Sequence, residues 1–183
     1  KIYFATKEDW RKWLEKNHLE QSKIAVIRYK KHTGKPSPSH QELMHEAICF
    51  GWIDTTIKRI DDEKYLINFS RRNEKSRWSD NTLSYGKKLL REGRMSEEGI
   101  KHYKAGLLKP SLDFGISKNP ETPKDLKDSL EKQKLLEKFE KLAPSLKRMQ
   151  LRWIERAKLK ETREKRISEV VNSVKQNKKG WNA

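Results

Sequence analysis

The 183-residue chain has a single cysteine, Cys49, so it cannot form an internal disulfide or hold a metal through several thiolates. No apolar run approaches the roughly 18 residues that a membrane-spanning helix requires. The first residues likewise contain no apolar core of the kind that a signal peptide carries. From these absences we expect a soluble, cytoplasmic protein.

The sequence also lacks the patterns that mark common catalytic sites. It has no glycine-rich phosphate loop, and its histidines do not recur at metal-ligand spacing. Cys49 stands beside Phe50 near an expected helix end, without the cationic setting that activates a thiolate. We therefore predict no catalytic residues, no metal and no cofactor, and an enzyme of unknown reaction stays as an alternative. The histidines, which we expect to be structural or exposed, are His18, His32, His40, His45 and His102.

Positive charge is the dominant feature of the composition. Lysine and arginine number 43 against 26 acidic residues, which gives a net charge of +17. Residues 134–183 carry 15 basic and 6 acidic side chains, or +9, so about half of the excess lies there. A field of this sign attracts nucleic acid, acidic partners or phosphorylated small molecules. Six tryptophans, five tyrosines and five phenylalanines indicate that the chain folds around a core.

The hydrophobic pattern predicts an α+β protein with a small antiparallel sheet, packed helices and an all-helical C-terminal segment. Capping residues locate the helix starts: Thr6, the Ser39 and Glu42 pair, Ser79 and Ser96. The helix that begins after Ser39 is expected to end at Gly51. Runs of β-branched and aromatic residues predict strands at 23–31, 52–60 and 64–70.

The chain is expected to have two folded parts. Residues 1–106 form an α+β domain that contains the hairpin 52–70, and the proline-containing residues 107–122 form a linker. Residues 123–183 form a basic helical segment. Because a helical segment of that size is marginally stable alone, we expect it to pack on the first part.

Side-chain parity predicts how the hairpin is paired. A three-residue turn at 61–63 sets Ile57 opposite Ile67, which gives one apolar face. The same register pairs Thr55 with Phe69, Thr56 with Asn68, Asp54 with Ser70, and Trp52 with Arg72. It therefore places Asp54 within ion-pair reach of Arg72, and the Arg72 guanidinium over the Trp52 ring.

Two interpretations of this polar face remain open. In the first, it is a solvated, salt-bridged outer face that keeps the hairpin soluble. In the second, guanidinium groups and a helix N-terminus converge on an anion, because these are the donors that such a ligand requires. The residues assigned to this anion site are Trp52, Asp54, Lys58, Arg71, Arg72, Ser76, Trp78, Ser79 and Asn81.

Several blocks of the sequence occur in the same order in one known family. They include Glu46-Ala47-Ile48-Cys49-Phe50-Gly51-Trp52-Ile53-Asp54, Arg71-Arg72-x-x-x-Ser76-x-Trp78-Ser79-x-Asn81 and Trp153-Ile154-x-x-Ala157-Lys158. On these blocks the chain resembles the bacteriocin-protection, YdeI or OmpD-associated family. It departs from the family pattern at Thr55, where a small residue is usual, and at Ser70, where proline is usual. The resemblance implies a cytoplasmic role in bacteriocin or stress protection without a settled biochemical activity. Combined with the hairpin, it leads us to expect binding of an anionic ligand or acidic partner.

Nucleic-acid binding is the main alternative function. Arg148, Arg152 and Arg156 recur every four residues and would form a basic ridge on a helix, continued by Lys158, Arg163 and Arg166. Such a ridge could follow phosphates without reading sequence. The same residues could equally form a solvated helix surface paired with Glu155, Glu161 and Glu164.

Overall fold

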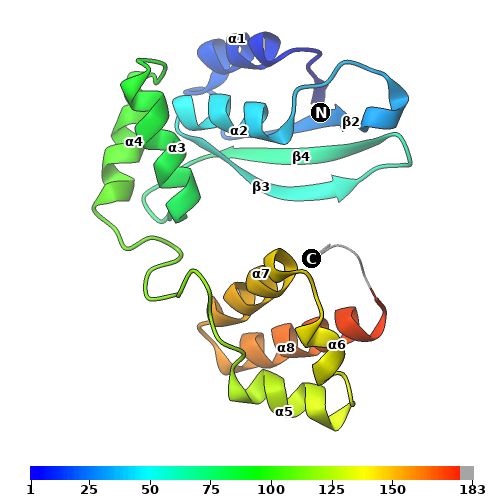
Figure 1. Cartoon of the computed structure of the whole chain (residues 1–183). Coiled ribbons are helices and arrows are strands. Elements are labelled where there is room, and N and C mark those ends of the chain that lie inside the picture. Colours follow the sequence, from blue (N-terminus) through cyan, green and yellow to red (C-terminus); the bar gives the residue numbers. More distant parts are fainter. Residues whose placement is uncertain (178–183) are drawn as a thin grey trace. The chain divides into compact units, whose positions relative to one another are not determined.

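A computed structural model describes residues 1–177 of the protein and divides the chain into two compact units. The first comprises Lys1–Leu112, and the second begins at Asp113. Strands and helices together confirm the α+β class, with helices alone in the second unit (Figure 1). The expected packing of residues 123–183 on the first part stays a prediction. Among the described residues, no helix is both long enough and apolar enough to cross a membrane.

A four-stranded sheet forms the base of the first unit. Its strands are β1 (Ile2–Tyr3), β2 (Lys23–Tyr29), β3 (Trp52–Arg59) and β4 (Lys64–Arg71), in the spatial order β1-β2-β4-β3. The β2–β4 and β3–β4 pairs are antiparallel. The sheet is nevertheless mixed rather than antiparallel as predicted, because the short β1 pairs with β2 in parallel.

Two helices lie side by side over one face of this sheet, α1 (Lys7–Asn17) and α2 (His40–Cys49) (Figure 1). Both begin with the capping boxes that the sequence indicates, Thr6 with Asp9 and Ser39 with Glu42. A short 3₁₀ helix, Lys31–Thr33, lies between β2 and α2. Trp10 of α1 packs on Phe69 of β4 with ring centres 5.2 Å apart, which places the core between the helices and the sheet.

Two further helices, α3 (Asp80–Arg91) and α4 (Glu97–Leu107), lie at one end of the sheet (Figure 1). The start of α4 is fixed to the end of α2. The Ser96 backbone N–H and hydroxyl both donate to the Cys49 carbonyl, at 2.9 and 3.0 Å. Gly99 permits this approach, because a Cβ there would lie 2.1 Å from the same carbonyl oxygen. The position of α4 therefore depends on backbone-to-backbone contact.

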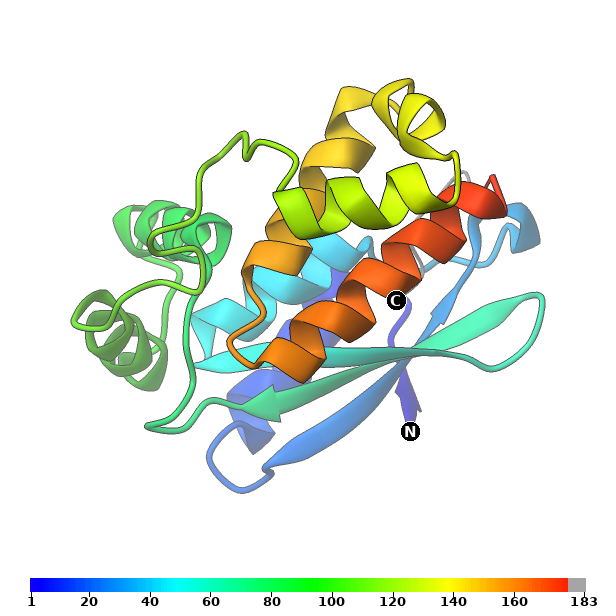
Figure 2. The ribbon, with the colours of Figure 1, turned by 90° about the horizontal axis from the view of Figure 1, so that it is seen from below.

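In its described part, the second unit begins with an irregular segment and then contains four helices. Its helices are α5 (Lys124–Lys132), α6 (Leu136–Glu140), α7 (Pro144–Glu155) and α8 (Lys160–Lys175), and Figure 2 shows α5 alongside α8. They enclose a separate apolar core, and its fully buried side chains include Leu126, Leu130, Phe139, Ile154 and Val170.

A β-bulge changes the predicted hairpin register. Ile57 pairs with Ile67 and Thr56 with Asn68, as expected, but Thr55 is an extra residue on β3. Beyond it the predicted pairs are wrong by one position: Asp54 pairs with Phe69, Ile53 with Ser70, and Trp52 with Arg71. A one-residue shift moves side chains to the opposite face of a sheet. Asp54 and Trp52 therefore share the helix-covered face with Phe69.

The close contact at Gly99 yields a stability prediction. In an open helix, Gly→Ala stabilises by about 0.5–1 kcal/mol, but Gly99→Ala should lower the free energy of unfolding by about 1–3 kcal/mol because the added methyl group overpacks the contact. Thermal and urea unfolding measure the change, with Lys104→Ala on the exposed side of α4 as control. A Gly99→Ala variant as stable as the parent would contradict this packing.

Candidate functional site

The first unit buries one arginine side chain directly after β4. Arg72 is only 3% exposed, and its guanidinium carbon lies 3.7 Å from the centre of the Trp78 ring. Its backbone N–H donates to the Gly51 carbonyl at 2.9 Å, which fixes the start of the side chain beside the α2–β3 turn. The guanidinium thus lies over an aromatic ring in a cation–π contact.

The donors of this guanidinium are only partly used. Nη1 donates to the Arg77 carbonyl at 3.3 Å. Nε and Nη2 are buried and have no hydrogen-bond partner among the described residues. Leaving a buried donor unsatisfied costs about 1–3 kcal/mol, and more for a charged group. Because buried polar groups are nearly always hydrogen-bonded, these unsatisfied donors require an explanation.

Burial also perturbs the charge of Arg72. It lowers the pKa of the guanidinium to about 10, and the negative charge of Asp54 opposes part of that shift. The group is still protonated at pH 7. An anion placed against it would favour the charged form and raise the pKa again.

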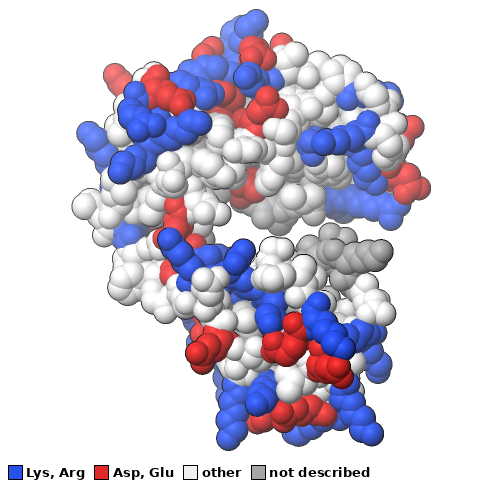
Figure 3. Space-filling view, in the orientation of Figure 1, with Lys and Arg blue, Asp and Glu red and all other residues white. Residues whose placement is uncertain are grey.

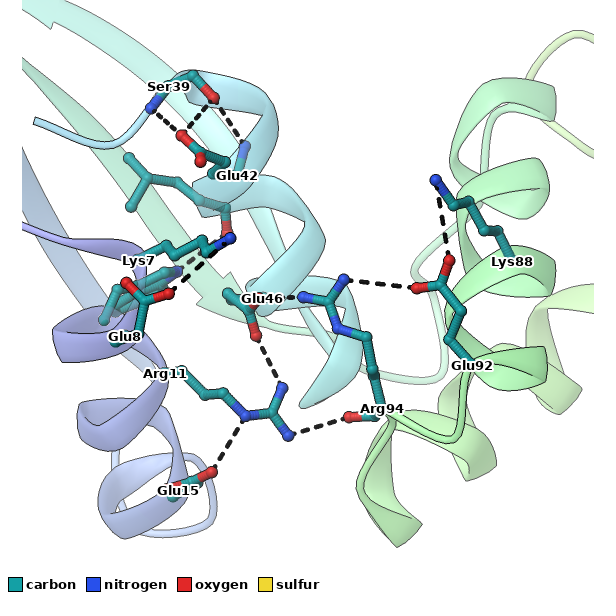
Figure 4. Close-up of polar contacts among 12 residues, drawn as sticks. Lys7, Glu8, Arg11, Glu15, Ser39, Glu42, Glu46, Lys88, Glu92 and Arg94 are labelled. Carbon is teal, nitrogen blue, oxygen red and sulfur yellow. Dashed lines mark hydrogen bonds and ion pairs between the residues drawn. The ribbon is translucent and has the colours of Figure 1, made fainter.

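Several other arginines, unlike Arg72, form ion pairs with buried carboxylates. In the first unit Glu46, with a side chain 4% exposed, lies between Arg11 and Arg94 (Figure 4). The Arg11 Nη1 to Glu46 Oε2 distance is 2.8 Å, and Arg11 also donates to the Arg94 carbonyl. This cluster joins α1, α2 and the α3–α4 connection, and its charges are neutralised within the fold.

The second unit repeats this pairing. The buried Asp113 carboxylate forms an ion pair with Arg152 at 3.0 Å and accepts hydrogen bonds from Arg156. In both units, therefore, a buried carboxylate pairs with two arginines. Arg72 contrasts with these clusters, because no carboxylate of the described residues lies within ion-pair distance of its buried guanidinium.

Arg72 is one of the residues that line a hollow of about 240 Å³ in the first unit. One wall comes from the segment after β4, namely Arg72, Asn73, Glu74, Ser76 and Trp78. The other comes from α4 and the residues after it, namely Lys101, His102, Ala105, Gly106 and Lys109. We call this hollow the Arg72 pocket.

Close packing fixes the aromatic wall of the Arg72 pocket. The Trp78 ring lies against Gly106, where a Cβ would be 2.4 Å from its Cδ1 and Nε1 atoms. Tyr103 contacts the same ring edge-on, with centres 5.8 Å apart. The guanidinium and α4 thus hold the tryptophan between them.

The loop that forms the other wall is held by its own hydrogen bonds. The Asn73 N–H donates to the Ser76 hydroxyl at 3.0 Å, and the Lys75 N–H donates to Asn73 Oδ1 at 2.9 Å. Arg77 then donates to the Ser111 carbonyl at 2.6 Å. The Leu112 N–H also donates to the Trp78 carbonyl at 2.8 Å. The start of the predicted linker is therefore attached to the pocket loop.

Of the nine residues assigned to the anion site, the pocket brings together Arg72, Ser76 and Trp78. Arg71 instead donates to the Leu19 carbonyl at 2.6 Å. Ser79 caps α3, accepting from the Thr82 N–H as predicted. Lys58 and Asn81 are exposed. The predicted cation–π contact also changes partner, because Arg72 stacks on Trp78 rather than Trp52.

Asp54 and Trp52 are placed elsewhere by the Thr55 bulge. Trp52 is fully buried and donates from Nε1 to the His18 carbonyl at 3.2 Å, so it belongs to the core. Asp54 Oδ2 lies 3.1 Å from His40 Nε2, not in the predicted ion pair with Arg72. This hydrogen bond lowers the pKa of Asp54 despite the opposing effect of burial. The carboxylate acts on Arg72 through its charge alone.

Sequence reasoning missed the α4 side of the pocket. His102 was expected to be structural or exposed, yet it lines the pocket, and its Nε2 lies 3.1 Å from Glu98. Burial lowers the pKa of His102, so the ring is neutral at pH 7. A signal was present: Lys101 with Ala105 and His102 with Gly106 are each four apart, which places them on one side of a helix.

A larger hollow of about 890 Å³ lies elsewhere in the first unit. Its polar lining includes Lys23, Thr56, Asn68 and Ser70. Asn68 donates to the Thr56 hydroxyl at 2.8 Å, and Thr55 donates to the Asn68 carbonyl at 3.2 Å. Asn68, Thr55 and Thr56 are thus hydrogen-bonded to one another across the two strands.

The predicted basic ridge of the second unit is largely engaged in internal contacts. Arg152 and Arg156 bind Asp113, and Arg148 donates to Asn119 at 3.2 Å. Arg163 binds Asp125 and Glu155, and Arg166 lies over the Trp153 ring. Lys158 is exposed. On the face of this unit drawn in Figure 3, basic and acidic side chains are interspersed.

A reactive cysteine or a cluster of metal ligands would indicate catalysis. Cys49 is buried, and burial raises the pKa of its thiol to about 11, with the Glu46 charge adding to the shift. It is therefore a protonated core side chain at pH 7. Within residues 1–177 no group of three or more histidine, cysteine, aspartate or glutamate side chains is arranged to hold a metal ion.

Two family models match the chain, and the boundary between the two units lies in the gap between the two matches. Residues 2–102, more than half of the chain, match the model of a domain of unknown function (DUF8412). The chain belongs to that family. Residues 119–177 match the model described as Bacteriocin-protection, YdeI or OmpD-Associated, which confirms the resemblance for that segment. The Arg72 pocket lies in the part that matches the first model, apart from Ala105, Gly106 and Lys109 just beyond it. No curated protein and no solved structure matches the chain.

The Glu46 cluster yields the second prediction. Glu46→Ala should lower the free energy of unfolding by about 2–3 kcal/mol, because two arginines lose a buried carboxylate. Their partial exposure allows some hydration and keeps the loss below that of a fully buried pair. Urea unfolding measures it, with Glu15→Ala as the control for an exposed partner of Arg11. Equal effects of the two substitutions would show that the cluster is not a structural joint.

The Asp54–His40 contact predicts a pH dependence. Because the folded pKa of Asp54 lies below its unfolded value, its stabilisation is present above the unfolded pKa and disappears as pH falls through the folded one. Asp54→Asn should therefore cost about 1 kcal/mol at pH 7 and flatten the loss of stability in the acid range. The measurement is thermal unfolding between pH 2 and pH 7, with the exposed Asp62→Asn as control. An unchanged acid slope would refute the assignment.

Proposed function

We propose that the protein binds a small anion in the Arg72 pocket. The observation that carries this proposal is a hollow lined by three cationic side chains, Arg72, Lys101 and Lys109. Arg72 is only 3% exposed and has no carboxylate partner among the described residues. An anion there would lie close to these positive charges, and charges near a buried group are screened less than charges in water. Since the fold supplies no carboxylate to Arg72, the ligand would not have to displace one.

The pocket supports a small ligand rather than an acidic protein partner. Its lining residues enclose a hollow, and the Arg72 side chain among them is almost wholly covered. A flat acidic surface would meet Lys101 and Lys109 but would not reach a buried guanidinium edge. We also propose that the protein is cytoplasmic, and the cytoplasm is rich in small anions.

The biological role follows from the family names and is part of the same proposal. The family that matches residues 119–177 is named for bacteriocin protection, and we infer a role in bacteriocin or stress protection. In this role the first unit would sense or hold the anion. The domain of unknown function that covers residues 2–102 adds no activity by name.

Nucleic-acid binding receives less support as an alternative. A phosphate-binding ridge needs arginines that are free to leave their neighbours. Arg152, Arg156 and Arg163 are instead paired with Asp113, Asp125 and Glu155. The other two arginines of the expected ridge, Arg148 and Arg166, are not buried. Arg72, in contrast, is buried and has no carboxylate partner among the described residues.

A thermal-shift comparison tests the proposed function. Phosphate, sulfate, citrate and acetate are added at constant ionic strength to the parent protein, to Arg72→Ala and to Arg71→Ala. A ligand that binds the folded state raises its stability in proportion to the logarithm of ligand concentration, by about 2.7 kcal/mol at 100 times the dissociation constant. At least one anion should stabilise the parent protein and Arg71→Ala but not Arg72→Ala.

Arg71→Ala is the matched control, because it removes the same side chain from the adjacent, exposed position. Both variants have the same net charge, so a nonspecific anion effect would change them equally. Loss of the shift in both variants, or in neither, would overturn the assignment to Arg72.

A further inference from the structure

The end of α4 and the residues after it expose three leucines that are close together in the chain. Leu107 is 54% exposed, Leu108 is 88% exposed and Leu112 is 43% exposed. A single exposed leucine is ordinary on a protein surface, whereas a group of neighbouring ones marks contact with a partner or a membrane. We call these three side chains the leucine patch.

The segment that carries the leucine patch is held in place by the rest of the first unit. The Leu112 N–H donates to the Trp78 carbonyl at 2.8 Å, and Arg77 donates to the Ser111 carbonyl at 2.6 Å. At the start of the segment, Gly106 packs against the Trp78 ring. The leucines therefore project into solvent from a fixed support, although their side chains have few neighbours.

The charges within this segment are all positive. From residue 99 to residue 112 the sequence has three lysines and no aspartate or glutamate, although acidic residues make up 26 of the 183. These lysines, Lys101, Lys104 and Lys109, are exposed. Lys101 and Lys104 precede Leu108 by seven and four residues, which places them on its side of the helix. The leucine patch thus has lysines beside it.

One acid just before the segment pairs with this group. Glu98 lies 3.4 Å from Lys101 and 3.1 Å from His102. The Lys101 side chain is 74% exposed, and an ion pair of such an exposed lysine contributes little. Lys104 and Lys109 form no ion pair with a carboxylate of the described residues, so the surface keeps a positive charge.

An anionic lipid surface matches both parts of this surface. Leucines enter the boundary between headgroups and acyl chains, and lysines stay beside the headgroup phosphates. A second copy of the chain matches less well, because a two-fold interface would bring the lysines of both copies together. A soluble polyanion would use the lysines but leave the leucines in water.

We propose that the protein docks on an anionic membrane surface through the leucine patch, with Lys101, Lys104 and Lys109 at the lipid headgroups. The contact is peripheral: the leucines enter only the outer part of the bilayer. This inference goes beyond the proposed function, because none of the three leucines lines the Arg72 pocket.

Vesicle binding tests the partner. The full chain is sedimented with vesicles of phosphatidylcholine alone and of phosphatidylcholine mixed with phosphatidylglycerol, and it should bind only the mixed vesicles. Joint replacement of Leu107 and Leu108 by alanine should weaken this binding by at least about tenfold, because each buried methylene group adds to lipid affinity. Leu19→Ala, which shortens an exposed leucine elsewhere in the first unit, should bind like the parent protein.

Matched lysine variants separate the patch from the net charge of the protein. Joint replacement of Lys101, Lys104 and Lys109 by alanine should weaken binding to the mixed vesicles by about fivefold per lysine. The control removes the same number of exposed lysines from α1 and β2, namely Lys12, Lys16 and Lys23. It should weaken binding by less than about twofold, because charges held farther from the lipid are screened by salt. Melting temperatures show that each variant folds.

A fluorescent label reports insertion directly. Leu108→Cys supplies an exposed thiol, whereas Cys49 is buried and burial raises the pKa of its thiol to about 11. A water-sensitive dye therefore reacts at position 108. Its emission should shift to shorter wavelength with the mixed vesicles and not with heparin, a soluble polyanion. The same dye attached through Leu19→Cys should shift with neither.

Each contrary outcome overturns the proposal. Mixed vesicles that do not bind, or neutral vesicles that bind equally well, would exclude an anionic lipid surface. Equal losses in the two lysine variants would show an effect of net charge alone, and full binding without Leu107 and Leu108 would exclude the apolar contact. A dye at position 108 that is shielded from water before vesicles are added would show that the chain itself covers the leucines.

A dye at position 108 that responds to heparin would assign the surface to a soluble polyanion and would also overturn the proposal. None of these outcomes changes the proposed function. Joint replacement of Leu107 and Leu108 should leave the anion-dependent thermal shift as it is in the parent protein, because these side chains lie outside the Arg72 pocket.

Discussion

The burial of one positive charge without a carboxylate is the constraint on which the pocket depends. Removing a guanidinium from water disfavours its charged form, and the depressed pKa of Arg72 reflects that effect. The fold compensates in part through the Trp78 face and the Arg77 carbonyl. Two donors stay unused. Elsewhere the same chain places Glu46 and Asp113 between pairs of arginines, so the missing acid at Arg72 is a local property of this position.

The scaffold around Arg72 is built from short-range backbone contacts. Gly99 lets the start of α4 touch the end of α2, and Gly106 lets the far end of α4 touch Trp78. Because both contacts lie on one helix, the position of α4 sets the pocket wall and the tryptophan together. Lys101 and His102 lie on the turn between these two contacts. A substitution that moved α4 would therefore change the pocket without touching Arg72.

Local signals in the sequence predicted local structure well. Thr6, Ser39, Ser79 and Ser96 each cap a helix, because a cap is decided by residues three positions apart. The Thr55 bulge was not predictable from alternation, which assumes that each residue has one partner. That bulge redirected Asp54 to His40 and Trp52 to the core. Arg72, Ser76 and Trp78 line one pocket and are also close together in the chain, whereas the α4 residues join them through a tertiary contact that side-chain periodicity alone does not encode.

The most direct test of the account is the Arg72 Nε–H signal in a ¹⁵N–¹H nuclear magnetic resonance spectrum, assigned by its loss in Arg72→Lys. A buried donor exchanges slowly with water and reports the partner that it acquires. As inorganic phosphate is added, this signal should move and saturate because a negative charge is placed near the guanidinium, while the exposed Arg71 signal stays in place. An Arg72 signal that does not move at saturating phosphate, or that moves together with Arg71, would contradict the claim that an anion binds in the Arg72 pocket.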